Sequence, residues 1–139
     1  MRDKIFVDSN IWIYLFTSDD VSKNEFARTF IADNVAKENI LVISFQVINE
    51  VGAVLKRKKK FDESKIQFVI ETILDLCVVQ DLSREIILKA SDLRNTMSFS
   101  YWDSIIVATA LEANCQYLTS EDMQNGQKIE GITIVNSLR

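Results

Sequence analysis

Short apolar runs rich in β-branched residues alternate with longer segments of helical periodicity along the whole chain. The runs that predict strands are 5–7, 40–43, 77–79, 116–119 and 132–135. The segments that predict helices are 21–37, those that follow Ser44, Asp62 and Ser83, and 102–112. Strands that alternate with helices form parallel βαβ units with helices on both faces of the sheet. The sequence therefore predicts a three-layer α/β/α domain around a central, mainly parallel sheet of about five strands.

The length of 139 residues fits one domain, which we expect to span residues 1–139. No stretch approaches 18 uncharged apolar residues, and the N-terminus lacks the apolar core of a signal peptide. We therefore expect a cytoplasmic protein without a membrane partner. Cys77 and Cys115 lie in apolar contexts, which predicts buried free thiols rather than a disulfide framework or a zinc site.

Several residue types that catalysis often uses are missing. The sequence has no His, no Pro and only three Gly. The lack of His excludes Ser-His-Asp and Cys-His catalysis and any His-ligated metal. Three Gly are too few for a P-loop or a dinucleotide-binding loop. The remaining options are chemistry by carboxylates, hydroxyls, Lys or Arg, or a protein without catalytic chemistry.

Four acidic residues occupy positions that solubility alone does not explain. Asp8 directly follows the first predicted strand, and Asp122 follows the fourth. Glu50 interrupts the apolar stripe of its helix, and Asp103 opens the most apolar helix. Ligands of such sheets bind at the carboxyl ends of the strands, so we expect these acids to lie together. Taken singly, each has an ordinary explanation as a helix cap, a helix-start acid, a turn residue or an ion-paired surface acid.

Carboxylates that lie together either take up protons or bind cations, because two charges about 4 Å apart repel by roughly 4 kcal/mol. Oxygen ligands without His or Cys favour Mg²⁺ or Mn²⁺, and such ions catalyse phosphodiester hydrolysis. The net charge of −4 and the pI near 4.9 argue, taken alone, against a nucleic-acid partner. Without the four acids the charges balance at sixteen of each sign. A metal-loaded enzyme would therefore not repel a polyanion.

Four segments, in order and spread over nearly the whole chain, resemble the motifs of PIN domains. The first is 7–14, with the Asp-Ser-Asn of Asp8, Ser9 and Asn10. The second is 44–51, in which a Ser precedes Glu50, and the third is 103–110, an Ala-rich helix opened by Asp103. The fourth is 118–126, with the Ser-x-Asp that ends at Asp122. The tail, 129–136, resembles the closing strand of VapC-type toxins.

This resemblance implies a Mg²⁺-dependent (or Mn²⁺-dependent) endoribonuclease. By the resemblance, the metal-binding and catalytic residues are Asp8, Glu50, Asp103 and Asp122, and the polar residues that orient ligands or water are Ser9, Asn10 and Ser120. It also implies the toxin of a toxin–antitoxin pair, a homodimer that acts on RNA and is inhibited by a cognate antitoxin protein. Whether Glu121 shares the role of Asp122 stays open.

Two further features each have a functional and an ordinary interpretation. The basic run Lys56, Arg57, Lys58, Lys59 and Lys60 is either an RNA-contacting patch on the helix of Glu50 or a solvated helix end. The aromatic residues 99, 101 and 102 beside Asp103, and 12, 14 and 16 after the first motif, are expected in the core rather than on a base-stacking or partner-binding face.

Three alternatives to a toxin remain. One is a PIN nuclease of RNA processing, and another is a catalytically silent PIN-fold module that binds RNA or a partner. The third is an aspartyl-phosphate enzyme with Asp8 as nucleophile. The last is disfavoured because Asn10 stands where such an enzyme would have a second acid.

Overall fold

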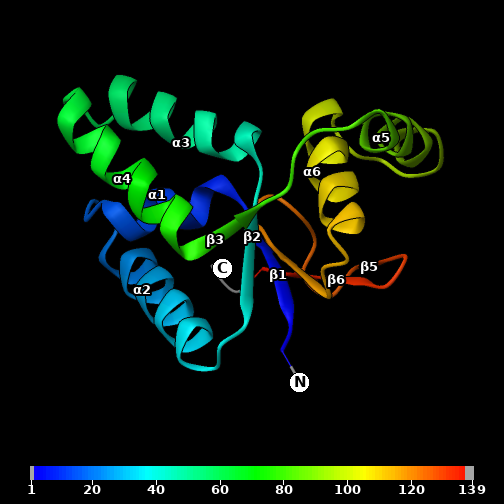
Figure 1. Ribbon diagram of the computed structural model, residues 1–139, viewed down its shortest axis with the longest axis horizontal. Helices are drawn as coiled ribbons and strands as arrows, with labels where there is room; N and C mark the ends of the chain where they lie inside the picture. The colour runs from blue at the N-terminus through cyan, green and yellow to red at the C-terminus, as the bar shows by residue number, and fades with distance from the viewer. Residues whose placement is uncertain (1, 137–139) are drawn as a thin grey trace.

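The computed structural model describes residues 2–136, which form six strands and six helices (Figure 1). The strands are β1 (Lys4–Val7), β2 (Ile40–Ile43), β3 (Cys77–Val79), β4 (Tyr117–Thr119), β5 (Lys128–Ile129) and β6 (Ile132–Val135). The helices are α1 (Ser9–Phe16), α2 (Val21–Ala36), α3 (Phe45–Arg57), α4 (Glu63–Leu76), α5 (Arg84–Thr96) and α6 (Tyr101–Glu112). The N-terminal Met and residues 137–139 of the predicted 1–139 domain lie outside the described residues.

The strands form one sheet in the order β3-β2-β1-β4-β6-β5. All neighbours are parallel except β5, which pairs antiparallel with β6. The prediction of a mainly parallel sheet is confirmed, but the estimate of about five strands missed β5. This strand has only two residues, and the turn into β6 places Glu130 and Gly131 at φ 48° and 98°. Such a turn is usually recognised by Asn-Gly or Asp-Gly, so Glu-Gly did not indicate a hairpin.

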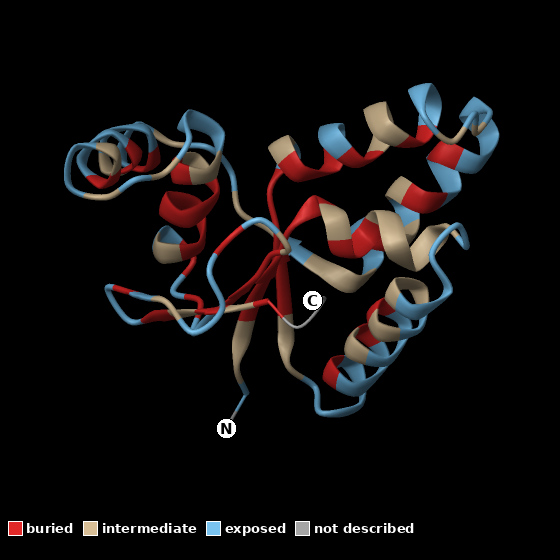
Figure 2. Ribbon diagram, turned by 180° about the vertical axis from the view of Figure 1, so that it is seen from behind, coloured by how far each residue is buried: buried red, intermediate tan, exposed pale blue. Residues whose placement is uncertain are grey.

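Helices cover both faces of the sheet, as a three-layer domain requires. Figure 1 shows α1 to α4 on one side of the strands and α5 with α6 on the other. Figure 2 shows buried residues concentrated in the strands and on the inward-facing turns of the helices. Phe6, Leu118 and Ile134, on three adjacent strands, are fully buried. These three are register partners and share one face of the sheet, whereas the buried neighbours Ile5 and Val7 on β1 lie on the opposite face, so the core forms on both sides of β1.

The helices begin at polar capping residues. Ser44 caps α3, Asp62 caps α4 and Ser83 caps α5, as the sequence predicted. Asp8 caps α1, the ordinary role that the sequence left open for it. An N-cap side chain accepts a hydrogen bond from a backbone N–H that the helix leaves unpaired. None of the helices within residues 2–136 has the length and apolar character needed to cross a bilayer.

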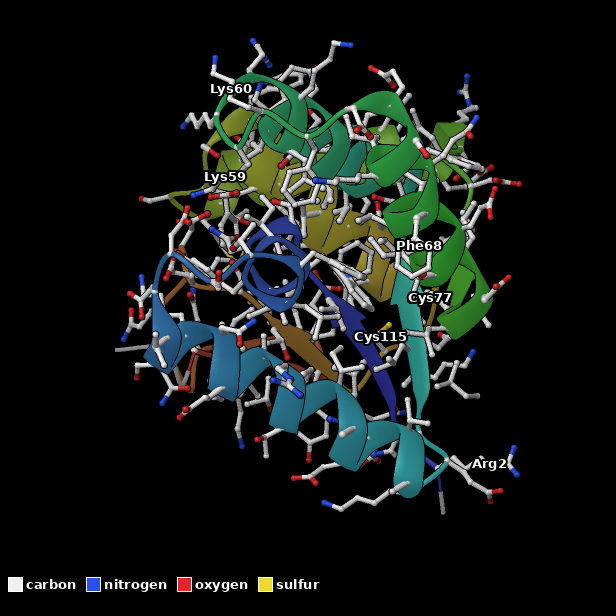
Figure 3. All side chains as sticks on the ribbon, turned by 90° about the vertical axis from the view of Figure 1, so that its left-hand side faces the viewer. Arg2, Lys59, Lys60, Phe68, Cys77 and Cys115 are labelled. Atoms are coloured by element: carbon white, nitrogen blue, oxygen red, sulfur yellow. The ribbon has the colours of Figure 1, made fainter. Side chains whose placement is uncertain are left out.

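Both cysteines are free thiols (Figure 3). Cys115 is buried, as predicted, whereas Cys77 is only half-buried. Burial raises the pKa of each thiol to about 12. Because the thiolate is the reactive species, burial disfavours the reactive form of both cysteines.

The order of the sheet brings two distant segments together at its carboxyl edge. Strands β1 and β4 are parallel neighbours, with Val7 opposite Thr119. The backbone N–H of Asp8 continues this ladder by donating to the carbonyl of Thr119, at 3.0 Å. Residues that follow the two strands therefore lie side by side although they are about 110 positions apart in sequence.

Candidate active site

A cleft of about 610 Å³ lies at the carboxyl edge of the sheet. All four predicted acids line it, each from a different part of the fold: Asp8 after β1, Glu50 on α3, Asp103 on α6 and Asp122 after β4. The remaining lining residues are Ser9, Gln46, Asn49, Ala53, Trp102 and Ile106. The structure thus brings the four acids to one cleft, as expected from the sequence.

Asp8 is the buried member of the set, with 4% of its surface exposed. Its Oδ1 accepts a hydrogen bond from the Ser9 N–H at 2.7 Å, and its Oδ2 accepts one from the Ser120 hydroxyl at 2.9 Å. Burial raises the pKa of Asp8 to about 6; the negative charges of Glu50 and Asp103 add to this, and the two hydrogen bonds oppose it. The ionised form of Asp8 is therefore held at an energetic cost that a nearby cation would offset.

Glu50 reaches the cleft from the exposed side of α3. The Ser9 hydroxyl donates to its Oε2 at 3.1 Å, and the Gln46 side-chain amide donates to its Oε1 at 3.2 Å. Ser9 therefore contacts both acids, through its backbone N–H to Asp8 and through its hydroxyl to Glu50. Gln46 lies one helical turn before Glu50, so it holds this carboxylate from the same helix face.

Asp103 and Asp122 form the other side of the cleft. Asp103 lies in the first turn of α6, which Ser100 caps. Partial burial raises the pKa of Asp103; a hydrogen bond with Ser100 opposes this, and the charge of Asp122 adds to it. The N–H of Asp122 donates to the Ser120 hydroxyl at 3.2 Å. One serine hydroxyl thus connects the buried carboxylate of Asp8 to the loop that carries Asp122.

The predicted supporting residues do not all reach the cleft. Ser9 lines it, and Ser120 lies buried beneath it. Asn10 is not among the lining residues; its side-chain amide donates to Glu121 Oε1 at 3.4 Å. The Asn10 side-chain oxygen is buried without a hydrogen-bond partner among the described residues. The structure therefore places Asn10 against Glu121 rather than against the four acids.

Glu121 is engaged away from the cleft, by a network that sequence reasoning missed. Lys23 donates to Glu121 Oε2 at 2.8 Å, and the Tyr14 hydroxyl donates to Oε1 at 2.7 Å. Burial raises the pKa of Glu121, but the hydrogen bonds from Lys23, Tyr14 and Asn10 outweigh it and leave the pKa lowered. Because α1, α2 and the loop after β4 meet here, the network anchors the loop on which Asp122 lies.

Cleft residues on α3 and α6 were also missed by sequence reasoning. Gln46 and Asn49 lie four and one positions before Glu50, and helical spacing alone places Gln46 beside that carboxylate. Trp102 lies beside Asp103 and also lines the cleft. The Lys23–Glu121 pair joins residues 98 positions apart, so no local pattern indicates it.

The oxygen-only donor set suits a divalent cation. Within residues 2–136, no three of the Asp, Glu or Cys side chains are grouped closely enough to bind a metal ion as placed. The four carboxylates nevertheless line one cleft, and hard oxygen ligands of this kind suit Mg²⁺ or Mn²⁺. The residues that would hold such an ion are Asp8, Glu50, Asp103 and Asp122.

The basic run lies at the C-terminal end of α3. Figure 3 shows Lys59 and Lys60 at the opposite end of the molecule from Arg2. Lys56 pairs with Glu63, and Lys59 pairs with Asp19. Among the described residues, the remaining members of the run, Arg57, Lys58 and Lys60, form no ion pair and are exposed.

The aromatic residues separate into a buried and an exposed group. Trp12 is fully buried, and its indole N–H donates to the Val7 carbonyl at 3.2 Å. Residues 14, 16 and 99 are half-buried and pack against the core. The expectation of core packing is wrong for Tyr101 and Trp102, which are exposed. The first turn of α6 projects beyond the core, so this helix is buried on most sides only from Ser104 onward.

Comparison with known families assigns this fold. The family model that matches is the PIN domain, over residues 5–125. This chain belongs to the PIN domain family. No curated protein sequence matches it.

Solved PIN-fold structures are similar over nearly the whole chain. VapBC-1 from nontypeable Haemophilus influenzae has a TM-score of 0.69 at 20% identity and covers 96% of this chain and 97% of its own. VapBC2 from Rickettsia felis, bound to a promoter DNA fragment, has a TM-score of 0.66 at 20% identity. The match covers 96% of this chain and 98% of the Rickettsia chain. VapC20 from Mycobacterium tuberculosis, a toxin that cleaves the sarcin–ricin loop, has a TM-score of 0.61 at 16% identity and covers 82% and 86%. These likenesses establish a shared PIN fold.

Proposed function

We propose that this PIN-domain chain is a divalent-metal-dependent endoribonuclease that acts as the toxin of a toxin–antitoxin pair, as a single domain over residues 1–139. The observation that carries the proposal is the convergence of four acids on one cleft, with Asp8 buried at its base. Burial of a carboxylate among other carboxylates opposes folding unless a cation compensates the charge. A protein without a use for the cation would be expected to replace such a residue.

Each acid has a definite place in the proposed reaction. Asp8, Glu50, Asp103 and Asp122 would hold the cation, which would supply activation of water and stabilisation of the leaving oxygen. Ser9 and Ser120 fix the carboxylate of Asp8 by hydrogen bonds to its two oxygens. Ser9 also orients Glu50. These serines act as outer partners of the ligands, which restrict ligand geometry and commonly affect metal affinity by about 10- to 100-fold.

The substrate reaches the cleft along α3 in this proposal. The face of α3 that lines the cleft at Gln46, Asn49, Glu50 and Ala53 continues at helical spacing to Lys56 and Arg57, the last helical residues, which begin the basic run 56–60. The unpaired members of the run, Arg57, Lys58 and Lys60, suit phosphates of an RNA strand that leaves the cleft. Lys56 and Lys59 pair with solvent-exposed acids, and such surface ion pairs are weak enough to exchange the acid for a phosphate.

The toxin role is supported by what similar structures contain. The Rickettsia felis and Haemophilus influenzae structures are VapBC proteins, and a further similar structure is a toxin–antitoxin complex from Klebsiella pneumoniae, with a TM-score of 0.66 at 21% identity. We propose a cognate antitoxin protein for this chain on that basis, and a homodimer from the resemblance of its motifs to VapC-type toxins. Purification with the product of an adjacent small reading frame, followed by measurement of the mass of the complex, tests both points.

The decisive experiment is RNA cleavage by the purified wild type, Asp8→Asn and Asp62→Asn, prepared identically. Asp62 is an exposed helix cap that does not line the cleft, and Asn also caps helices well, so this variant controls for the chemical change. We expect cleavage that requires Mg²⁺ or Mn²⁺, is retained in Asp62→Asn and disappears in Asp8→Asn. Equal cleavage by all three proteins would identify a contaminating ribonuclease and refute the proposed site.

The same assay distinguishes the alternative roles. A silent PIN module would bind RNA or a partner and cleave nothing with either metal. A processing nuclease would cleave RNA with the same dependence on Asp8 but would have no neutralising partner protein. The toxin role requires that the adjacent gene product suppress the cleavage.

A further inference from the structure

A second hollow of about 250 Å³ adjoins the candidate active site. It lies between the start of α3, the segment after β3 and the first turns of α6, and its apolar walls are Phe45, Leu82, Trp102 and Ile105. Gln46 and Trp102 line both this hollow and the carboxylate cleft. We call it the Trp102 pocket. A ligand in the Trp102 pocket would therefore be continuous with one in the cleft.

The chemistry of the two hollows differs sharply. Four carboxylates line the cleft, whereas no charged residue is among the described residues that line the Trp102 pocket. The polar groups of the Trp102 pocket are hydroxyls and the side-chain amides of Gln46 and Gln80. The Gln46 side-chain nitrogen is held by Glu50, which fixes the amide at the boundary between the hollows. An occupant of the Trp102 pocket must therefore be neutral, largely apolar and able to exchange hydrogen bonds with amides.

Trp102 is exposed but held in a defined orientation. It is 64% exposed, and its ring packs edge-on against Tyr101 with centroids 5.3 Å apart and planes at 74°. The Arg94 guanidinium lies 4.1 Å from the centroid of the Tyr101 ring and donates to the Ser104 hydroxyl at 2.7 Å. These contacts limit the motion of the indole before any ligand arrives, which lowers the entropy lost on binding.

We propose that the Trp102 pocket binds one unpaired nucleobase of the RNA, beside the phosphate that is cleaved. The inference rests on the proposed function. A nucleotide joins a neutral planar ring to an anionic phosphate, which matches a neutral aromatic pocket that opens into a cation-binding cleft. Aromatic side chains stack on bases, and amide side chains read the base edges that pairing would otherwise occupy. The substrate is therefore single-stranded at the cut site, and Gln46 and Gln80 contribute to the choice of base.

The Trp102 fluorescence reports directly on this contact. The chain has two Trp, and Trp12 is fully buried, so quenching by a bound base arises at Trp102. All variants are made in the Asp8→Asn background, which prevents cleavage and removes one negative charge from the cleft. The probes are single-stranded octanucleotides of adenosine or uridine, an abasic octanucleotide and a duplex RNA, each in EDTA, because the Asp8→Asn cleft is expected to bind no metal.

We expect quenching by at least one of the single strands and none by the abasic strand or the duplex. Affinities of all variants are compared by titration calorimetry, because replacement of Trp102 removes the fluorophore. Trp102→Ala should weaken binding of that strand by roughly 5- to 150-fold, the range that stacking of one base on an aromatic side chain gives. Trp102→Phe should retain most of the affinity. Phe68→Ala, which removes an aromatic side chain that is 66% exposed on α4 and outside this pocket, should leave the affinity unchanged.

The outcomes separate this inference from the proposed function. If Trp102→Ala binds every probe as tightly as its parent while the wild type cleaves RNA with metal, the pocket assignment is wrong and the nuclease stands. If the wild type neither binds nor cleaves any RNA, both fail. If Trp102→Ala loses only the binding of the adjacent gene product, the Trp102 pocket is a protein-docking surface and the inference is overturned.

Discussion

Replacement of Asp8 by Asn should stabilise the metal-free protein at neutral pH. Asn also caps helices, and its side-chain oxygen can accept from the Ser9 N–H as Asp8 does. Its amide can donate to the Ser120 hydroxyl, which now donates to Asp8. The substitution therefore keeps the local contacts and removes the buried negative charge.

The size of the effect follows from the pKa of Asp8. Burial raises it from the ordinary value of 3.8 to about 6. Between these values the folded protein binds more protons than the unfolded chain, so stability falls as the pH rises. A rise of about two pKa units, at 1.36 kcal/mol per unit, lowers the free energy of unfolding of the wild type by about 3 kcal/mol above pH 6. Asp8→Asn has no carboxylate and does not lose stability in this way. The difference in free energy of unfolding between the variant and the wild type should therefore be near zero below pH 4, grow between pH 4 and 6 and then remain constant.

Urea unfolding of the wild type and Asp8→Asn in EDTA, from pH 3.5 to 8, measures this difference. At neutral pH the melting temperature of the variant should be higher by on the order of 10 °C. Asp62→Asn, at an exposed cap, should stay within about 0.5 kcal/mol of the wild type at every pH. If Asp8→Asn is no more stable than the wild type above pH 6, Asp8 is not a desolvated carboxylate and the electrostatic reasoning fails.

Four further outcomes are expected. Mg²⁺ or Mn²⁺ should raise the melting temperature of the wild type but not of Asp8→Asn, because an ion that binds only the folded state stabilises it; an equal rise in both would place the ion elsewhere. Ser120→Ala should weaken Mn²⁺ binding about 10- to 100-fold in calorimetric titration, because it removes a hydrogen bond to Asp8; unchanged affinity would contradict this role. Glu121→Gln should reduce cleavage less than Asp122→Asn, because Glu121 contacts Lys23 and Tyr14 rather than the cleft; an equal loss would make Glu121 a ligand. Replacing both Lys58 and Lys60 with Gln should flatten the dependence of log affinity for single-stranded RNA on log salt by about 1.4, at ~0.7 per phosphate contact, whereas an unchanged slope would remove the basic run from the RNA path.

The parts of the fold that follow from local patterns could be predicted from the sequence. Apolar runs and polar helix starts such as Ser44 and Ser83 identified strands and helix beginnings because the backbone requirements at those points are local. The two-residue strand β5 could not be found, since its hairpin uses Glu130 and Gly131 in place of a typical turn pair. The end of α2 at Ala36 differs by one residue from the predicted 37, which is the usual fraying of helix ends.

The candidate site was predicted as a set of acids but not as a surrounding surface. Parallel strands bring Asp8 and the loop of Asp122 to one edge, so their proximity follows from the fold class. The exposure of Tyr101 and Trp102 depends on how far α6 extends past the core, which no periodicity reveals. The Lys23–Glu121 contact depends on how α2 packs beside α1. Such long-range placements come from packing, not from sequence spacing.

The most direct test of the central claim is a crystal structure with Mn²⁺, measured at the manganese absorption edge. If the four acids form the metal site, an anomalous peak will lie in the cleft among Asp8, Glu50, Asp103 and Asp122, and it will be absent from Asp8→Asn crystals grown in the same conditions. A cleft without such a peak at saturating Mn²⁺, or a peak that persists unchanged in Asp8→Asn, would contradict the proposal that these carboxylates form a metal-dependent active site.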